Sequence, residues 1–355
     1  MLAAAVGLAA GGPGAAEPVK VVDGLEHPWS MAWLPDGRML ITERPGRLRL
    51  LEPAEADSAP ELTTVEGVPD VYAAFQAGLF EVLPDPDFDD NQKLYLSFAH
   101  GSASANALRV VRARLEDATL RDVEPIFTSR PRRSTPVHLG GRMAFLDDGT
   151  LLVTQGDGFD YREAAQDPFD HLGTVVRIHT DGTIPADNPF ANGVDGAPEV
   201  YSWGHRNVQG VVPDPATGRI WSHEHGPRGG DELNVLKPGA NYGWPVATHG
   251  VDYSGAVISP FTERPGMRSP VYVWESAIAP AGLSRLEGDL LVAGLVSRDV
   301  RRLELDGAEV VSERSYFGEL RRRIRDVRVG PDGAVYLLTD HEAGALLRAP
   351  AEALE

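Results

Sequence analysis

Along most of this chain, short apolar runs alternate with polar residues and end at turns rather than continuing into helices. Period-2 alternation and β-branched runs predict β-strands, whereas the 3.6-residue period of an amphipathic helix is almost absent. The 38 glycines and 28 prolines supply the turn dipeptides between the runs. The pattern therefore predicts an all-β protein.

One unit, an apolar strand followed by an acidic turn and a second apolar strand, occurs six times. Its copies are Met31–Thr42, Leu79–Phe98, Met143–Thr154, Gly210–His223, Gly282–Ala293 and Val327–Leu338. Their spacing of roughly 45 to 70 residues matches a propeller blade of about 40–50 residues plus loops. The sequence thus predicts a six-bladed β-propeller with four-stranded antiparallel blades. Two β-sandwich domains would need a linker near the middle, which is missing, so we expect a single propeller domain over 17–355.

The first 16 residues are small and apolar, and Gly14-Ala15-Ala16 resembles a signal-peptidase site. The basic segment that normally begins a secretory signal is absent. We interpret residues 1–16 as a signal peptide of a periplasmic or secreted protein, with a disordered tail as the alternative. No later run reaches the ~18 apolar residues of a transmembrane helix, so we expect no membrane span.

The chain carries 33 basic and 52 acidic residues, a net charge of −19. A nucleic-acid backbone would be repelled by this charge, so nucleic-acid binding is not expected. There is no cysteine, which excludes disulfides, thiolate metal sites and cysteine nucleophiles.

Two segments of the third and fourth units carry candidate chemistry. His138 comes just before a predicted strand and Asp157 returns after its partner strand, a pattern that suits a general base oriented by a carboxylate. A purely structural pair is the alternative. Arg206 and Asn207 are adjacent donors suited to a planar anion or a carbonyl group, unless this arginine is simply a solvated loop residue.

The segment His223–Asn234 combines histidines with glycine, proline and acidic residues. Two histidines flanking Glu224 suggest zinc, but no third ligand is near in sequence. Backbone carbonyls and carboxylates are hard oxygen donors that suit Ca²⁺. A calcium loop is the preferred interpretation, and an acidic surface turn is the alternative.

Four arginines gather at Arg321-Arg322-Arg323-Ile324-Arg325, which is unexpected in so acidic a chain. Alternate residues of a strand share a face, so Arg323 and Arg325 could bind one polyanionic ligand. A surface patch that balances nearby acids is the alternative.

Several motifs in order resemble the soluble aldose sugar dehydrogenases that use pyrroloquinoline quinone (PQQ), in the glucose/sorbosone dehydrogenase family. The similarity runs from about Val21 to Ala349. The motifs are Glu26-His27-Pro28-Trp29-Ser30-Met31-Ala32, Gln76-Ala77-Gly78-Leu79, Glu224-His225-Gly226-Pro227-Arg228-Gly229-Gly230-Asp231-Glu232, Asn241-Tyr242-Gly243-Trp244-Pro245 and Arg323-Ile324-Arg325-Asp326-Val327. The resemblance implies a six-bladed propeller, which agrees with the count of hairpins.

The resemblance also implies roles for individual residues. His138 corresponds to the base that takes the proton from the anomeric hydroxyl of an aldose, with Asp157 near it. The carbonyl oxygens of Gly226 and Pro227 correspond to ligands of the Ca²⁺ that touches PQQ. Glu232 and Tyr242 resemble part of a second, structural calcium site. The residues that would hold or line PQQ are Gln76, Arg206, Asn207, Trp274, Ser276, Arg323 and Arg325.

One position departs from the family pattern. Val296 stands where the family usually has a lysine near the cofactor, and the chain has no lysine after Lys237.

Oxidation of an aldose at C1 would give a lactone, with electrons passing to an external acceptor such as a quinone, dye or cytochrome. A calcium-dependent propeller hydrolase and a non-catalytic carbohydrate-binding propeller are the alternative functions. The expected oligomeric state is a monomer or a dimer.

Overall fold

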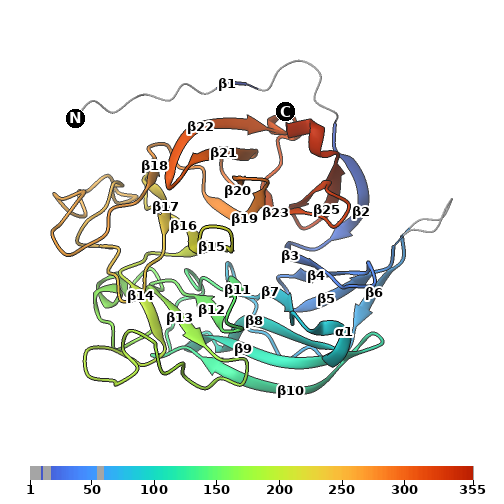
Figure 1. The fold of residues 1–355 in the computed structure, drawn as a ribbon, viewed down its shortest axis with the longest axis horizontal. Helices are drawn as coiled ribbons and strands as arrows, with labels where there is room; N and C mark the ends of the chain where they lie inside the picture. The colour runs from blue at the N-terminus through green and yellow to red at the C-terminus, as the bar shows by residue number, and fades with distance from the viewer. Residues whose placement is uncertain (1–8, 11–16, 54–59, 355) are drawn as a thin grey trace.

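Six β-sheets stand around a central axis like the blades of a propeller, as Figure 1 shows. This computed structural model describes residues 9–10, 17–53 and 60–354. Each blade has four antiparallel strands, so the predicted six-bladed β-propeller is confirmed. The interpretation of residues 1–16 falls almost entirely outside the described residues and stays a prediction.

The blades follow one another in chain order. Counted from the axis outward, blade 1 consists of β3 (Pro28–Trp33), β4 (Met39–Glu43), β5 (Arg47–Leu51) and β6 (Leu62–Val65). Blade 2 consists of β7 (Leu79–Pro84), β8 (Lys93–Ser102), β9 (Ala105–Glu116) and β10 (Thr119–Thr128). Blade 3 consists of β11 (Met143–Phe145), β12 (Leu151–Thr154), β13 (Thr174–Ile178) and β14 (Val200–Trp203).

The second half of the ring is built in the same way. Blade 4 consists of β15 (Val208–Asp214), β16 (Arg219–Glu224), β17 (Asp231–Val235) and β18 (Tyr272–Trp274). Blade 5 consists of β19 (Pro280–Leu286), β20 (Asp289–Gly294), β21 (Val300–Asp306) and β22 (Glu309–Tyr316), with β1 (Ala9–Ala10) parallel to β22. Blade 6 consists of β23 (Ile324–Val329), β24 (Val335–Thr339), β25 (Gly344–Ala349) and β2 (Val19–Leu25). Among the residues that the structure describes, helical structure is confined to α1 (Phe88–Asn91) and the 3₁₀ turns Arg162–Gln166, Gly318–Leu320 and Ala351–Leu354.

Blade 6 closes the ring because its strands come from both ends of the chain. β2 pairs antiparallel with β25, which brings the blue and red ends of the ribbon together in Figure 1. Closure leaves each blade packed between two neighbours. No helix within the described ranges is long and apolar enough to cross a membrane.

The hydrophobic core is divided among the junctions between blades. Every residue of β4 and of β12 is buried, because these second strands are covered on both faces by adjacent blades. The outermost strand β10, by contrast, has a mostly exposed middle. One apolar cluster fills each junction, for example Leu40 and Leu96 between blades 1 and 2. Local alternation therefore predicted the strands, and burial between blades explains why several of them read as continuous apolar runs.

The six predicted hairpins are the first two strands of the six blades. Their tight turns lie at one end of the ring, where Gly37 has φ +88°, a conformation that glycine adopts without strain. In an antiparallel pair, the start of the first strand and the end of the second lie together, here at the end of the ring opposite these turns. The loops at that end of the ring carry the predicted site.

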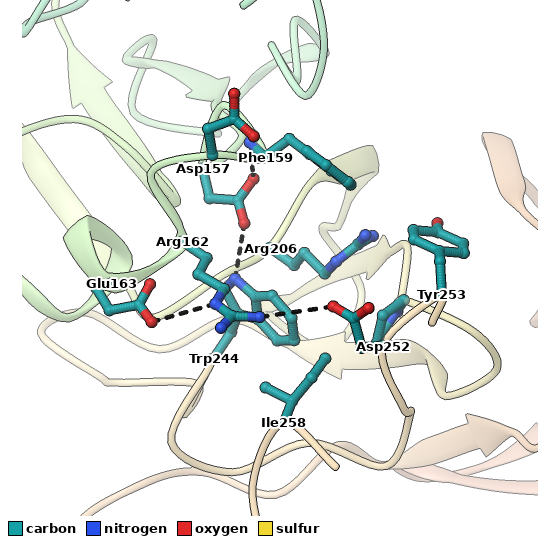
Figure 2. A pocket seen from close by; sticks show the side chains of 11 residues that line it. Asp157, Phe159, Arg162, Glu163, Arg206, Trp244, Asp252, Tyr253 and Ile258 are labelled. Carbon is teal, nitrogen blue, oxygen red and sulfur yellow. Dashed lines mark hydrogen bonds and ion pairs between the residues drawn. The ribbon is translucent and has the colours of Figure 1, made fainter. Parts of the chain in front are cut away.

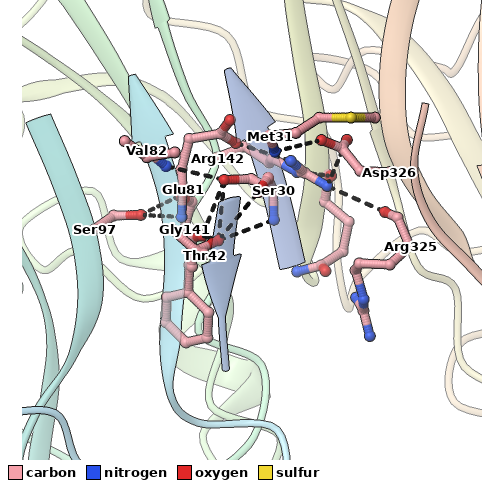
Figure 3. Close-up of polar contacts among 12 residues, drawn as sticks. Ser30, Met31, Thr42, Glu81, Val82, Ser97, Gly141, Arg142, Arg325 and Asp326 are labelled. Carbon is pink, nitrogen blue, oxygen red and sulfur yellow. Dashed lines mark hydrogen bonds and ion pairs between the residues drawn. The ribbon is translucent and has the colours of Figure 1, made fainter. Parts of the chain in front are cut away.

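A buried network of ions links blades near the axis (Figure 3). Nη1 of Arg142 lies 2.9 Å from Oε2 of Glu81, and its Nη2 lies 3.1 Å from Oδ1 of Asp326. Arg328 binds the same two carboxylates, at 2.7 Å to Glu81 and 3.1 Å to Asp326. These contacts join blades 2, 3 and 6. The guanidinium of Arg142 also lies 4.0 Å from the ring centroid of Trp29, below the predicted site.

Candidate active site

Most of the predicted residues meet at the end of the ring where the inner strands begin. Gln76, His138, Asn207 and Arg323 come shortly before β7, β11, β15 and β23. Asp157 follows β12, the second strand of blade 3. The hairpins all point in the same direction, so residues from four blades are brought to one end of the ring.

His138 and Asp157 form a buried hydrogen-bonded pair. Nδ1 of His138 lies 2.7 Å from Oδ1 of Asp157, and Trp244 Nε1 donates to Oδ2 at 2.8 Å. An ionised carboxylate only accepts hydrogen bonds, so the pair places the imidazole proton on Nδ1 and leaves Nε2 as an acceptor. The backbone N–H of His138 donates to Oε1 of Gln76 at 3.0 Å. The imidazole is therefore held in one tautomer and one orientation.

Burial and nearby charges set the protonation of this pair. Burial lowers the pKa of His138, Asp157 opposes that shift, and the positive charge of Arg206 adds to it. Burial alone would raise the pKa of Asp157, but its hydrogen bond with His138 and the charge of Arg206 hold it below its ordinary value. At neutral pH the pair is a neutral imidazole beside a carboxylate, the state that a general base requires.

A cavity of about 370 Å³, here called the central cavity, opens beside this pair. Its walls combine aromatic and aliphatic side chains with arginines and amides. The principal lining residues are Trp29, Arg44, Phe75, Gln76, Phe80, Leu139, Asn207, Gln209, Leu295, Val296, Arg323 and Arg325. Arginine-rich walls in a protein of charge −19 give this cavity a local preference for anions.

Arg323 and Arg325 converge on one carboxylate. Their Nη2 atoms lie 3.1 and 3.0 Å from Oδ2 of Asp340. Burial would raise the pKa of Asp340, but the charge of Arg325 and the hydrogen bond from His27 hold it well below its ordinary value. Two guanidinium groups thus share one negative charge, so the group keeps a net positive charge toward the cavity.

Asp157 of the pair also lines a second cavity of about 400 Å³, here called the side cavity (Figure 2). Asp157 and Arg206 line it, together with the exposed rings of Phe159 and Tyr253, whose centroids are 6.3 Å apart. The Phe159 ring also packs edge-on against His138 at 5.2 Å. Acidic residues complete the wall: Asp160, Glu163 and Asp252. Asp157 of the pair therefore lines the side cavity, whereas Gln76, which accepts the backbone N–H of His138, lines the central cavity.

The predicted calcium loop already faces a cationic side chain. Nη1 of Arg206 donates to the carbonyl oxygens of Gly226 at 2.6 Å and His225 at 3.1 Å. Pro227 lines the side cavity nearby. Asp231 shapes the loop by accepting the backbone N–H of Gly226 at 2.9 Å. These carbonyls are hard oxygen donors directed at a positive charge, so the loop fits a cation.

The two histidines of this segment do not converge as metal ligands. His223 is fully buried, and neither ring nitrogen has a hydrogen-bond partner among the described residues. His225 places Nε2 2.7 Å from the carbonyl oxygen of Pro280. Within the described ranges, no group of three or more histidine, aspartate and glutamate side chains could hold a metal ion. This arrangement does not favour the zinc interpretation.

Glu232 and Tyr242 line one small cavity with Glu224, where a single ion or water could fit. Burial and the neighbouring charge of Glu224 raise the pKa of Glu232 well above its ordinary value. The Tyr242 hydroxyl points elsewhere, because it donates to the carbonyl oxygen of Val235 at 2.7 Å. Only the main chain of Tyr242 is then available to a cation, whereas Glu232 offers a carboxylate that lacks a compensating positive charge.

Trp274 and Ser276 are not brought to either cavity. Trp274 lies in the junction between blades 4 and 5, and its Nε1 donates to Glu313 Oε1 at 2.8 Å. Ser276 is an exposed residue of the loop after β18. Their expected place at the cofactor stays a prediction that this arrangement does not support. Proximity in sequence to the loop did not reveal that the indole faces a neighbouring blade.

Three residues that sequence reasoning left unassigned belong to the site. Arg44 and Asp340 directly follow the second strands of blades 1 and 6, and Asp157 lies three residues after the second strand of blade 3. The recurrence of charged residues just after the second strand was the signal that the sequence offered. Trp244 lies within the motif Asn241-Tyr242-Gly243-Trp244-Pro245. Its hydrogen bond to Asp157 connects two blades, and the spacing of residues in the sequence does not predict such a contact.

The structure thus combines a six-bladed propeller with a buried histidine–aspartate pair and two polar cavities. The family described as Glucose / Sorbosone dehydrogenase matches residues 25–348. The chain is 38% identical to aldose sugar dehydrogenase YliI of Escherichia coli (strain K12) over 340 residues, covering 92% of this chain and 90% of that protein. The chain belongs to the glucose/sorbosone dehydrogenase family, a family of oxidoreductases, as its motifs predicted.

Solved structures agree with this assignment. A crystal structure of a glucose dehydrogenase has a TM-score of 0.90 and 42% identity, covering 95% of this chain and 100% of that one. The PQQ-bound form of an aldose sugar dehydrogenase from Streptomyces coelicolor has a TM-score of 0.77 and 29% identity, covering 93% of this chain and 96% of that one.

Proposed function

We propose that this chain oxidises aldose sugars at C1 to the lactone, using PQQ and Ca²⁺, and passes the electrons to an external acceptor. The observation that carries the proposal is the His138–Asp157 pair beside an arginine-lined cavity. Family membership and the PQQ-bound relative support the same chemistry. Sugar oxidation at C1 requires loss of the anomeric hydroxyl proton, and Nε2 of His138 is the acceptor for it.

The central cavity fits PQQ, a planar o-quinone with three carboxylates. Arg323 and Arg325 supply positive charge and forked donors for carboxylates, and Gln76 and Asn207 supply amides. The aromatic wall, which includes Trp29, suits a planar ring. When bound, PQQ supplies the two-electron oxidant for the sugar.

Calcium would be held at the loop that now faces Arg206. The carbonyl oxygens of Gly226 and Pro227 are the predicted ligands, and a divalent ion there would compete with the guanidinium for the Gly226 oxygen. Glu232 and the main chain of Tyr242 are the predicted residues of a second, structural calcium site.

The aldose would approach His138 from the side cavity. Asp157 and Arg206 line that cavity, and the Phe159 and Tyr253 rings offer apolar faces against which a sugar ring can pack. Asp157 orients the base and stabilises the imidazolium that forms when the proton is taken. A neutral lactone substrate would have no use for the arginines of the central cavity, which argues against the hydrolase alternative.

Reconstitution tests this proposal. Purified cofactor-free protein is mixed with PQQ and CaCl₂, then with glucose and a redox dye. Dye bleaching that requires both PQQ and Ca²⁺ is the expected result. The controls omit PQQ or add EDTA. No bleaching with any aldose, from protein shown to be folded, would refute the proposal. Export of the protein and the identity of its physiological electron acceptor are separate predictions that this assay does not test.

A further inference from the structure

Arg44 is the third arginine of the central cavity and has no assigned role. It directly follows β4 and lines the cavity together with Arg323 and Arg325. Those two arginines share the carboxylate of Asp340. Arg44, by contrast, makes no ion pair or side-chain hydrogen bond with any residue that the structure describes. The pKa of Glu26 is lowered chiefly by its hydrogen bond with Arg47 at 2.7 Å, and the charge of Arg44 contributes least to that shift.

The backbone of Arg44 is fixed on both sides. Its N–H donates to the carbonyl oxygen of His27 at 3.0 Å, and its carbonyl oxygen accepts the N–H of Leu79 at 2.9 Å. The first bond lies within blade 1 and the second crosses to blade 2. A half-buried cationic side chain on a fixed backbone is prepared to meet a ligand without ordering the chain first.

Gly78 explains how Arg44 comes so close to the cavity wall. A Cβ atom at position 78 would collide with both the carbonyl oxygen and Cγ of Arg44. Glycine at this position therefore lets the Arg44 side chain pass alongside Gln76, which also lines the cavity. The Gln76-Ala77-Gly78-Leu79 motif thus has a physical reason for its glycine beyond the amide of Gln76.

We propose that Arg44 binds a carboxylate of PQQ and supplies a second uncompensated positive charge in the central cavity. The inference rests on the proposed function, because it names a further residue for the same cofactor. Arg323, Arg325 and Asp340 together carry one net positive charge, which is small against three carboxylates. Val296, on the same cavity, is apolar and 56% exposed and contributes none. Arg44 adds a second net charge at a fixed position.

The test measures PQQ affinity of the cofactor-free protein in calcium buffer, without any turnover. Quenching of tryptophan fluorescence reports binding, since Trp29 lines the cavity. Arg44→Gln should weaken PQQ binding by about 10- to 100-fold, the loss typical of a charge-assisted hydrogen bond. Adding Val296→Lys to that variant should recover part of the affinity by returning a positive charge to the cavity.

Arg38→Gln is the matched control. Arg38 lies at the turn end of blade 1 and is paired with Asp36 at 2.7 Å, so the substitution changes net charge equally but far from the cavity. Unchanged affinity in Arg44→Gln, or an equal loss in Arg38→Gln, would overturn the proposal. If Arg44→Gln does not fold, Arg44→Met keeps the aliphatic stem beside Gly78 and should show the same loss of PQQ affinity. A wild-type protein that binds no PQQ would instead refute the proposed function.

Discussion

The imidazole of His138 lies 2.7 Å from the carboxylate of Asp157. His138 precedes β11 and Asp157 follows β12, the two strands of one hairpin in blade 3. The hairpin thus sets the distance between a base and the group that orients it. Trp244 of blade 4 holds the second carboxylate oxygen, so the pair depends on the packing of two blades.

Replacing His138 tests its role as the base. We expect His138→Gln to lower kcat by roughly 10²–10⁴-fold, because glutamine cannot accept the anomeric proton. PQQ affinity should stay close to that of the wild type, since the cavity arginines are untouched. Steady-state kinetics and fluorescence titration measure the two quantities separately. A variant with normal turnover would contradict the assignment.

Asp157→Asn should change the pH dependence in a defined direction. Turnover requires neutral His138, so activity falls as pH drops through the pKa of His138, which burial places below 6.5. Asp157 opposes that lowering by favouring the charged imidazole. Its removal should therefore move the acidic limb of kcat to lower pH and reduce kcat itself, because an amide no longer fixes the tautomer. A limb that moves to higher pH would refute this electrostatic account.

The sequence was sufficient for the fold and for part of the site. Hairpins such as Met143–Thr154 are predicted by local alternation and an Asp-Gly turn, and the pairing of His138 with Asp157 follows from the same hairpin. The shared position of Arg323 and Arg325 also followed from strand geometry. Contacts between blades could not be predicted from the sequence. Whether Trp274 faces the cavity or Glu313 depends on how blade 5 packs on blade 4.

Calcium should stabilise the protein through Glu232, and more strongly as pH rises. Without a cation, burial beside Glu224 raises the pKa of Glu232 well above 4.5 in the folded state. The folded protein then binds more protons than the unfolded chain, so its stability falls as pH increases above the unfolded pKa. Calcium favours the ionised carboxylate and should reverse this loss. Thermal unfolding with CaCl₂ or EDTA at several pH values measures the effect.

Glu232→Gln provides the comparison for calcium. The amide does not titrate, so the variant should lose both the pH-dependent fall in stability and most of the gain from calcium at this site. Glu163→Gln, on the exposed wall of the side cavity, removes the same charge outside the small cavity and should leave both effects in place. Equal behaviour of the two variants would show that Glu232 does not bind the ion.

The Arg142 network should be essential for stability rather than for chemistry alone. Arg142 is 3% exposed and binds Glu81 and Asp326, so Arg142→Met leaves buried carboxylates with half their positive partners. Removing one member of a buried ion pair costs about 3–5 kcal/mol of unfolding free energy, because the remaining charge is uncompensated. Urea unfolding followed by tryptophan fluorescence measures the loss.

Arg348→Met is the exposed counterpart in blade 6. Arg348 and Asp332 lie 2.8 Å apart and are each 40% exposed, so solvent screens the pair and its loss should cost less than about 1 kcal/mol. A similar small cost for Arg142→Met would mean that Arg328 alone compensates both Glu81 and Asp326. In that case the ring would be held by its interblade apolar clusters, and Arg142 would serve mainly to position the carbonyl oxygens of Gln209 and Arg325 beneath the cavity.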